Sequence, residues 1–357
     1  MKNRSIRIAD REISRNNPPY IIAEMSGNHN GDINNAFEII KIAKESGASA
    51  VKLQTYTADT LTVNSSKKDF QINEGLWKGK SLYQLYEWAH TPWDWHKELF
   101  EYARSLELTI FSSPFDPTAV DFLEDLNVPA YKIASFEAID LPLIKYAANT
   151  GKPMIISTGM ANESEIEEAI DTAKSNGCKE LAILHCVSGY PAPSEDYNLK
   201  TITDMIEKYD VLVGLSDHTL NNLTAIASVA LGASIFEKHI TINRENGGPD
   251  DSFSLEKEDL MSLCNDLEST WKALGAIDYK RKSSEQGNII FRRSLYFVKD
   301  LRKGDLITRD SIRSIRPGYG ISPKYFDDIL NKKLVADVER HTPVTFELIE
   351  DLDRKVR

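Results

Sequence analysis

The chain has 357 residues, of which 41% are hydrophobic and 27% are charged, and this balance is typical of a globular protein. Its 43 basic and 54 acidic side chains give a net charge of −11, which argues against nucleic acid or an anionic membrane as a partner. No apolar run reaches the roughly 18 residues that span a bilayer, and the charged N-terminus shows no signal peptide. Because its three cysteines form no C-x-x-C pair, we expect a cytoplasmic protein without a disulfide framework.

Eight short apolar segments alternate with longer amphipathic segments. The short segments are hydrophobic on both faces, as strands of a buried parallel sheet are. The longer ones, such as 34–47 and 163–177, repeat apolar residues at helical spacing and end in glycine. Eight such units predict a (β/α)8 TIM barrel. An open doubly wound sheet is the alternative, but no G-x-G-x-x-G follows the first strand. The predicted strands cover 20–26, 48–56, 108–115, 130–135, 153–158, 181–187, 211–218 and 234–241.

Two stretches interrupt this alternation. Residues 57–90 form a long polar insertion after the second predicted strand, and at that position it would lie over the barrel mouth. Residues 279–288 are basic and polar, which indicates a linker. We therefore expect a barrel domain over 1–278 and a small module over 289–357. A module of that size is near the lower limit of independent stability, so it is expected to pack on its own barrel or on a partner.

Polar residues gather at the ends of all the predicted strands, where the active site of a TIM barrel lies. His218 and His239 end neighbouring strands and could share one divalent metal ion, with water or substrate completing the coordination. The alternative is a pair of buried histidines bonded to the backbone. The strand-end residues include Glu24, Ser26, Lys52, Gln54, Ser113, Lys132, Ser135, Ser157, His185, Ser188, Tyr190, Ser216, Asp217, His218, Glu237, Lys238 and His239.

Three lysines, Lys52, Lys132 and Lys238, are predicted to lie within strands, where a buried ammonium group is unfavourable unless an anion pairs with it. They could clamp phosphate and carboxylate groups, one of them could form a Schiff base, or each could simply pair with a neighbouring acidic residue. Asp250 lies in a turn after the last strand and would project over the mouth. The possible acidic partners are Glu24, Asp217 and Glu237.

An ordered series of motifs from residue 20 onward resembles the sialic acid synthase family. The motifs are IIAEMSGNHNG, AVKLQTY, FSSPFD, YKIASFE, STGM, SDHT, EKHIT, GGPDDSFSLE and RPGYGISP. Within the family, the first motif together with LYQLYEWAHTPWDWHKELF and FSSPFDPTAVDFLE is most similar to the pseudaminic acid synthase branch.

The resemblance implies that phosphoenolpyruvate condenses with an N-acetylated amino sugar to give a nine-carbon 2-keto acid and phosphate. In the pseudaminic branch the acceptor is 2,4-diacetamido-2,4,6-trideoxy-L-altrose. Legionaminic or N-acetylneuraminic acid synthase is the alternative within the family, and a Schiff-base pyruvate aldolase is the alternative of another class. The implied metal is Mn²⁺, with Mg²⁺ or Co²⁺ as substitutes. The C-terminal module resembles a SAF (antifreeze-like) domain, which in relatives caps the active site of the other subunit in a domain-swapped homodimer.

The resemblance also implies roles for individual residues. His218 and His239 would hold the metal, while Glu24 and Asp250 would act on the sugar or the tetrahedral intermediate. Arg316 would reach the sugar's N-acyl group from the partner's module. Lys52 and Lys132 would bind phosphoenolpyruvate, and the further substrate-binding residues would be Ser113, Ser135, Ser157, Ser188, Tyr190 and Ser216. Some relatives have asparagine at the position of Ser188.

Selection of the acceptor is expected to depend on the 57–90 insertion. A 6-deoxy sugar with two acetamido groups calls for a more apolar pocket than N-acetylmannosamine does. Trp77 and Tyr83, both within the insertion, are the residues expected to supply that apolar surface.

Overall fold

The computed structural model describes residues 4–350. The chain divides into two compact units, Met1–Gly275 and Ala276–Arg357. The predicted linker, 279–288, is irregular at its start, and its residues from Ser283 onward lie in a 3-10 helix (Ser283–Phe291). Among the helices of residues 4–350, none is long and apolar enough to cross a membrane.

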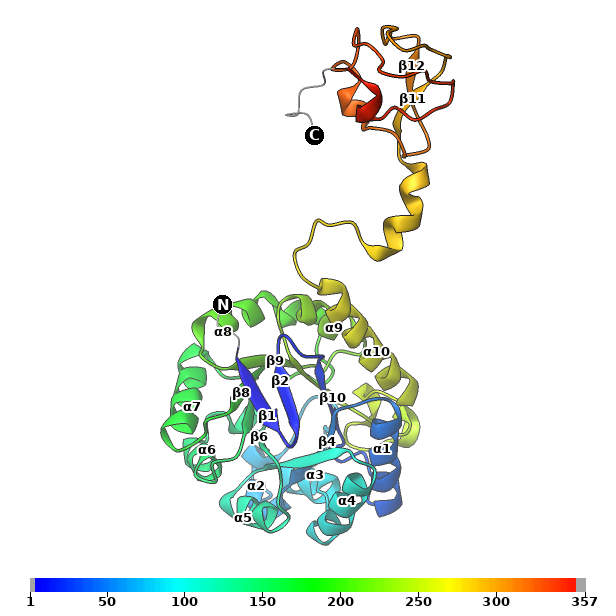
Figure 1. Cartoon of the computed structure of the whole chain (residues 1–357). Helices are drawn as coiled ribbons and strands as arrows, with labels where there is room; N and C mark the ends of the chain where they lie inside the picture. Colours follow the sequence, from blue (N-terminus) through cyan, green and yellow to red (C-terminus); the bar gives the residue numbers. More distant parts are fainter. Residues whose placement is uncertain (1–3, 351–357) are drawn as a thin grey trace. The chain divides into compact units, whose positions relative to one another are not determined.

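The first unit is a closed barrel of parallel strands, which confirms the predicted fold class. Each strand pairs with the next along the chain, and β10 closes the ring by pairing with β3. Helices surround the strands (Figure 1). The barrel strands are β3 (Tyr20–Glu24), β4 (Ala50–Thr55), β5 (Thr109–Pro114), β6 (Tyr131–Ile133), β7 (Met154–Ser157), β8 (Leu181–Cys186), β9 (Leu212–Ser216) and β10 (Ile235–His239). The surrounding helices are α1 (Ile33–Glu45), α4 (Trp93–Ser105), α5 (Pro117–Asp125), α6 (Leu141–Ala148), α7 (Glu163–Ser175), α8 (Lys200–Lys208), α9 (Leu223–Ala230) and α10 (Lys257–Leu274).

The barrel interior changes from apolar to polar along the strands. Because side chains alternate between the two faces of a strand, residues two apart face the same side. Ile22, Ala50, Phe111 and Ile155 belong to one buried apolar cluster. Two residues further toward the carboxyl ends, the same faces carry polar groups. These buried residues are Glu24, Lys52, Ser113, Lys132, Ser157, Cys186 and Glu237.

A hairpin of β1 (Ser5–Ile8) and β2 (Arg11–Ser14) precedes the barrel and was not predicted. Its buried side chains, Ile6, Ile8 and Ile13, join the same apolar cluster as the first residues of the barrel strands. The hairpin therefore closes the amino-terminal end of the barrel. Isoleucine alternates with charged residues in this segment, but over only four residues in each strand, so the signal for a half-buried strand is weak.

The 57–90 insertion contains two short helices, α2 (Ala58–Leu61) and α3 (Leu82–Ala89), joined by a loop with a 3-10 turn (Lys68–Phe70). Ser81 caps α3 by accepting a hydrogen bond from the backbone of Gln84, whose side chain bonds back to Ser81. The insertion therefore contains regular elements, although more than half of its residues lie outside them.

The second unit has a hydrophobic core of its own, although it was expected to depend on packing against something else. A two-stranded sheet of β11 (Ser294–Phe297) and β12 (Ile312–Ile315) supplies part of that core. The core residues are Leu295, Phe297, Ile307, Ile312, Ile321, Ile329, Leu334, Val338, Val344 and Ile349.

Candidate active site

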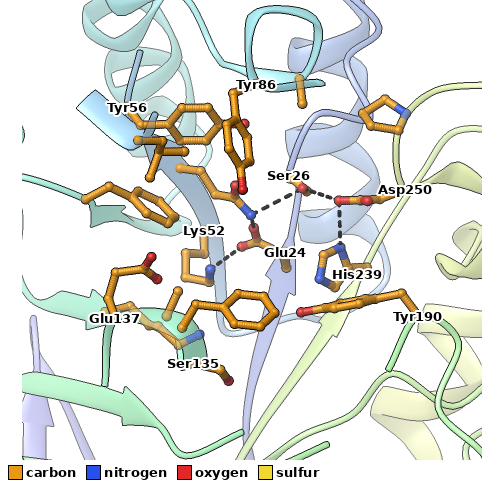
Figure 2. Close-up of a pocket in the computed structure, with 18 of the residues that line it drawn as sticks. Glu24, Ser26, Lys52, Tyr56, Tyr86, Ser135, Glu137, Tyr190, His239 and Asp250 are labelled. Carbon is orange, nitrogen blue, oxygen red and sulfur yellow. Dashed lines mark hydrogen bonds and ion pairs between the residues drawn. The ribbon is translucent and has the colours of Figure 1, made fainter. Parts of the chain in front are cut away.

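A cavity of about 220 Å³ opens at the carboxyl ends of the barrel strands. The charged ends of β3, β4, β6 and β10 form its floor, and the insertion forms part of its wall (Figure 2). This position confirms that the insertion lies over the mouth of the barrel. The predicted site residues that line the cavity are Glu24, Lys52, Lys132, Ser135, Tyr190, Ser216, His218, His239 and Asp250.

Two lysines and two glutamates form a buried charge cluster on the floor. Lys52 Nζ lies 2.6 Å from Glu24 Oε2 and 3.6 Å from Glu237 Oε1. Lys132 Nζ lies 3.0 Å from the same Glu237 oxygen. Burial alone would raise the pKa of Glu237, but the two ammonium groups hold it below its usual value. The cluster therefore carries two positive and two negative charges, and it is close to neutral.

Strand register brings the floor of the cavity together. Glu24 on β3 lies opposite Lys52 on β4 and opposite His239 on β10. Gln54 Nε2 donates to Glu24 Oε1 at 2.8 Å and so orients the carboxylate. Three candidate residues from strands distant in sequence are thus held in one row across the sheet.

Asp250 joins this row from the turn after β10. Its Oδ2 accepts a hydrogen bond from Ser26 Oγ and lies 3.7 Å from His239 Nδ1, as Figure 2 shows. Burial raises the pKa of Asp250 to about 6, although the Ser26 hydroxyl acts in the opposite direction. The prediction that Asp250 projects over the mouth agrees with its place in the cavity lining.

The rings of His218 and His239 lie 5.4 Å apart, between centroids. His218 Nδ1 lies 2.8 Å from the Val187 carbonyl, which only accepts, so Nδ1 carries a proton and Nε2 is left for another partner. Burial and the neighbouring positive charges place the pKa of His239 well below its usual range, so this ring is neutral. Its Nδ1 is buried without a hydrogen-bond partner. These two imidazoles fit a divalent cation as ligands.

The cation would have few other protein ligands. Within residues 4–350, no set of three or more His, Cys, Asp or Glu side chains is grouped to hold a metal ion. Water and substrate atoms would therefore complete its coordination, which leaves the positions that Lewis-acid chemistry needs.

The predicted serines surround the charge cluster in different ways. Ser113 Oγ accepts from Lys52 Nζ at 3.2 Å, and Ser135 Oγ accepts from the Gly159 amide at 3.2 Å. Ser157 and Ser188 have buried hydroxyls without a partner. A side chain at Gly159 would clash with the hydroxyl groups of both Ser135 and Ser188. Glycine at this position therefore lets the two serine hydroxyls lie close to the Gly159 amide. Ser113, Ser157 and Ser188 are not cavity-lining residues.

Tyr190 covers the histidine pair. Its ring centroid lies 4.4 Å from that of His218 and 6.2 Å from that of His239. It also contacts Trp77, whose indole N–H donates to the Pro249 carbonyl at 2.8 Å. Trp77 therefore connects the insertion to the turn that carries Asp250.

The structure decides between the alternatives for Lys238, which pairs with an acidic residue, and it contradicts one expectation, that for Tyr83. Lys238 faces away from the cavity, because it alternates with Glu237 and His239 on β10. Its Nζ donates to Asp217 Oδ2 at 2.8 Å and to the Thr219 carbonyl at 2.7 Å, so it holds the segment after β9 in place. Only Lys52 and Lys132 of the three lysines line the cavity and could bind phosphate and carboxylate groups there. Tyr83 does not line the cavity, because its side chain is directed to Asp59.

One candidate was missed by sequence reasoning. Glu137 lies in a 3-10 turn (Ser135–Glu137) after β6 and lines the cavity. Its Oε2 is buried without a hydrogen-bond partner, and burial raises the pKa of Glu137 to about 7. Figure 2 shows Glu137 among the side chains that surround the cavity. It is therefore a carboxyl group that carries a proton near neutral pH, which is the property of a general acid.

The wall of the cavity above the floor is apolar. The Tyr56 ring lies edge-on to Tyr86 and Phe115, with centroids 5.9 Å and 5.1 Å away. Leu61 from α2 and Leu85 from α3 line the same cavity. We call Tyr56, Leu61, Leu85, Tyr86 and Phe115 the apolar wall.

Arg316 lies in the second unit. It is exposed and precedes Pro317, to which it is joined by a cis peptide bond. Its predicted contact with the sugar stays a prediction.

Comparisons with known proteins support both units. The NeuB family matches residues 39–279, and the SAF domain matches residues 292–350. A pseudaminic acid synthase from Helicobacter pylori is 42% identical over 334 residues, which cover 93% of this chain and 98% of that protein. An N,N'-diacetyllegionaminic acid synthase from Campylobacter jejuni is 38% identical, over 87% of this chain and 94% of that protein. The crystal structure of N-acetylneuraminic acid synthetase from Leptospira borgpetersenii, in complex with citrate, superposes with a TM-score of 0.71 at 32% identity, covering 81% of this chain and 96% of that chain.

Proposed function

Because the chain belongs to the NeuB family, we propose that it is a pseudaminic acid synthase that condenses phosphoenolpyruvate with 2,4-diacetamido-2,4,6-trideoxy-L-altrose. The reaction class is supported by the buried Lys52 and Lys132 pair on a cavity floor beside two imidazoles. The choice of acceptor rests on the 42% identity with the Helicobacter pylori enzyme across 93% of the chain.

The charge of the floor supports the proposed metal. Glu24 and Glu237 already balance Lys52 and Lys132, so a donor with a phosphate and a carboxylate would bring uncompensated negative charge into a buried site. His218 and His239 would hold a divalent cation, which would supply the missing positive charge and the Lewis acidity that an aldehyde acceptor needs. By resemblance this ion is Mn²⁺, with Mg²⁺ or Co²⁺ as substitutes.

The chain's own residues account for the other requirements of the reaction. Lys52 and Lys132 hold the phosphate and carboxylate of phosphoenolpyruvate, together with hydroxyls such as that of Ser135. The enol carbon of the donor forms a bond to the aldehyde carbon, and Glu137 gives its proton to the aldehyde oxygen.

The remaining step is the release of phosphate. Positive charge that develops at C2 of the donor is quenched by water, and Glu24, oriented by Gln54, takes the water's proton. The tetrahedral intermediate then loses phosphate as its C–O bond breaks, and the new C2 hydroxyl gives its proton to the departing phosphate and becomes the ketone. Lys132 acts through its charge and forms no covalent bond to the substrate.

The first test is phosphate release from phosphoenolpyruvate with Mn²⁺ and three acceptors. We expect strong preference for the L-altrose sugar over 2,4-diacetamido-2,4,6-trideoxy-D-mannose and N-acetylmannosamine. EDTA should abolish turnover, and borohydride should trap no pyruvyl adduct. Preference for another sugar would assign the chain to a sister branch. A trapped adduct with EDTA-resistant turnover would identify an aldolase of the Schiff-base type instead.

The enzyme's proposed assembly is a homodimer in which each SAF domain covers the partner's active site. Exposed apolar side chains follow β6, β7 and β9 beside the cavity, and such a surface is typical of an interaction site. These residues, with their exposed fractions, are Phe136 57%, Ile139 61%, Met160 77%, Leu220 58% and Leu223 69%. The proposed compartment is the cytoplasm, which agrees with three buried, unpaired cysteines.

The exchange of domains is tested with two inactive variants. Arg316→Ala impairs the donated domain, and His218→Ala impairs the barrel site. If each site uses Arg316 from the partner, mixing the two variants should restore activity at sites that combine an intact barrel with an intact SAF domain. The measure is phosphate release before and after the chains are mixed and allowed to exchange. No recovery, with exchange verified by differently tagged chains, would contradict the arrangement.

A further inference from the structure

We propose that the apolar wall binds the 6-deoxy end of the acceptor and discriminates against a hydroxyl group at C6. The inference rests on the proposed function, because it concerns which part of the same cavity binds the far end of the acceptor and determines specificity for it. It assigns selection to residues of α2, α3 and the segments after β4 and β5, and it reserves the charged floor for the donor.

Strand β4 and Tyr56, the residue that follows it, give the depth of three levels along the cavity. Lys52, Gln54 and Tyr56 alternate along the chain, and all three line the cavity. Residues two apart on a strand are about 6 to 7 Å apart. Lys52 therefore marks the floor, Gln54 marks a middle level beside Glu24, and Tyr56 marks the level of the apolar wall.

The length of the acceptor matches this spacing. The donor binds at the Lys52 level, so the acceptor's aldehyde carbon must lie just above it, at the level of Gln54 and within reach of the row formed by Lys52, Glu24 and His239. An extended six-carbon chain with bonds of about 1.5 Å reaches roughly 6 Å. When its first carbon lies at the middle level, its last carbon therefore arrives at the level of Tyr56.

The chemistry of the wall suits a methyl group. Phe115 and the leucines offer no hydrogen-bonding side-chain atoms, and Tyr56 is 3% exposed. Moving a methyl group from water to such a surface is favourable because apolar area is removed from water. Against Phe115 and the leucines a hydroxyl group would lose its hydrogen bonds to water, and the phenol groups of Tyr56 and Tyr86 are the only wall side chains that could replace them. Leu61 is half-buried at the end of α2, so it can be changed without opening the barrel core.

The test compares Leu61→Asn with Val63→Asn. Val63 lies two residues further along, is 57% exposed and does not line the cavity, so it is a matched control. Each enzyme is assayed with the 6-deoxy acceptor and with its 6-hydroxy counterpart, 2,4-diacetamido-2,4-dideoxy-L-altrose. Because one methylene or methyl contact is worth roughly 10- to 200-fold, we expect the wild-type ratio of kcat/KM to favour the 6-deoxy sugar by at least about tenfold.

Leu61→Asn should lower that ratio by about tenfold, through KM for the acceptor, with KM for phosphoenolpyruvate unchanged. Val63→Asn should keep the wild-type ratio. Phe115→Tyr, which adds one hydroxyl to the same ring, is the second variant if Leu61→Asn unfolds at a lower temperature, and it should change the ratio in the same direction. An unchanged ratio in a folded wall variant would overturn the inference while leaving the proposed function intact. A wild-type enzyme silent with every acceptor would overturn both.

Discussion

Replacing Lys132 by methionine is expected to lower kcat/KM for phosphoenolpyruvate by about 10³-fold, the loss found when a preorganised electrostatic group is removed from a dry site. Lys132 is buried and lies 3.0 Å from Glu237. Without its ammonium group, Glu237 keeps only the longer 3.6 Å contact with Lys52. The floor then has one positive charge fewer at the moment it must receive an anionic donor.

The same substitution affects stability, and the experiment must separate the two effects. Removing one partner of a buried ion pair costs about 3 to 5 kcal/mol. We therefore expect a lower melting temperature for Lys132→Met, together with the kinetic loss at temperatures where the variant stays folded. Lys145→Met, at an exposed position on α6, is the control and should change neither quantity. Steady-state kinetics with varied donor and a thermal melt provide the measurements.

Lys132→Arg distinguishes charge from covalent chemistry. The guanidinium group keeps the positive charge but forms no Schiff base with a ketone. If Lys132 acts through its charge, the arginine variant should retain at least about ten times the activity of the methionine variant, which corresponds to roughly 1.4 kcal/mol of transition-state stabilisation. Equal inactivity of the two variants, with normal melting of the arginine variant, would favour a covalent role instead.

The second large effect is expected for Glu137→Gln, which should lower kcat by about 10² to 10⁴-fold, the usual contribution of a general acid. The Glu137 carboxyl group faces the cavity, and burial raises its pKa to about 7. Charged groups around it act in both directions. Lys132 and Lys52 lower this pKa, and Asp140 raises it.

The pH profile identifies the role of Glu137. An acid must be protonated to act, so kcat/KM should fall as the pH rises through about 7. In Glu137→Gln that limb of the profile should disappear, because the amide does not titrate, while the residual rate stays low across the range. A merely structural role would lower activity without removing the limb. Persistence of an unchanged limb in the variant would rule out Glu137 as the titrating acid.

Sequence reasoning was most successful where a periodic pattern decides the structure. The apolar runs predicted the barrel, and the position of a TIM-barrel site led to Glu24, Lys52 and His239, which strand register then placed in one row. That rule depends only on strands ending at a common rim, so it needs no knowledge of individual contacts. The insertion over the mouth follows from the same logic.

The points that the sequence left open or missed have a common physical cause. Lys238 and Glu237 are adjacent in sequence, so their side chains point to opposite faces of β10. The sequence does not say which of the two faces the cavity. Two further elements were missed because they do not belong to the alternating series of strands and helices. Glu137 belongs to a 3-10 turn rather than a strand, and the first hairpin consists of two strands of four residues each. Short elements of this kind carry too few periods to be distinguished from irregular chain.

The hairpin at the base of the barrel has a kinetic consequence. With Ile6, Ile8 and Ile13 packed against the start of the strands, the deep end of the cavity is a blind end, and both reactants must arrive through the mouth. Phosphoenolpyruvate, which belongs at the lysine level, lies beneath the place that the sugar takes. Once the sugar occupies the apolar wall, the route to the lysines is obstructed. The two reactants should therefore add in compulsory order, donor first, and excess sugar should inhibit competitively against phosphoenolpyruvate.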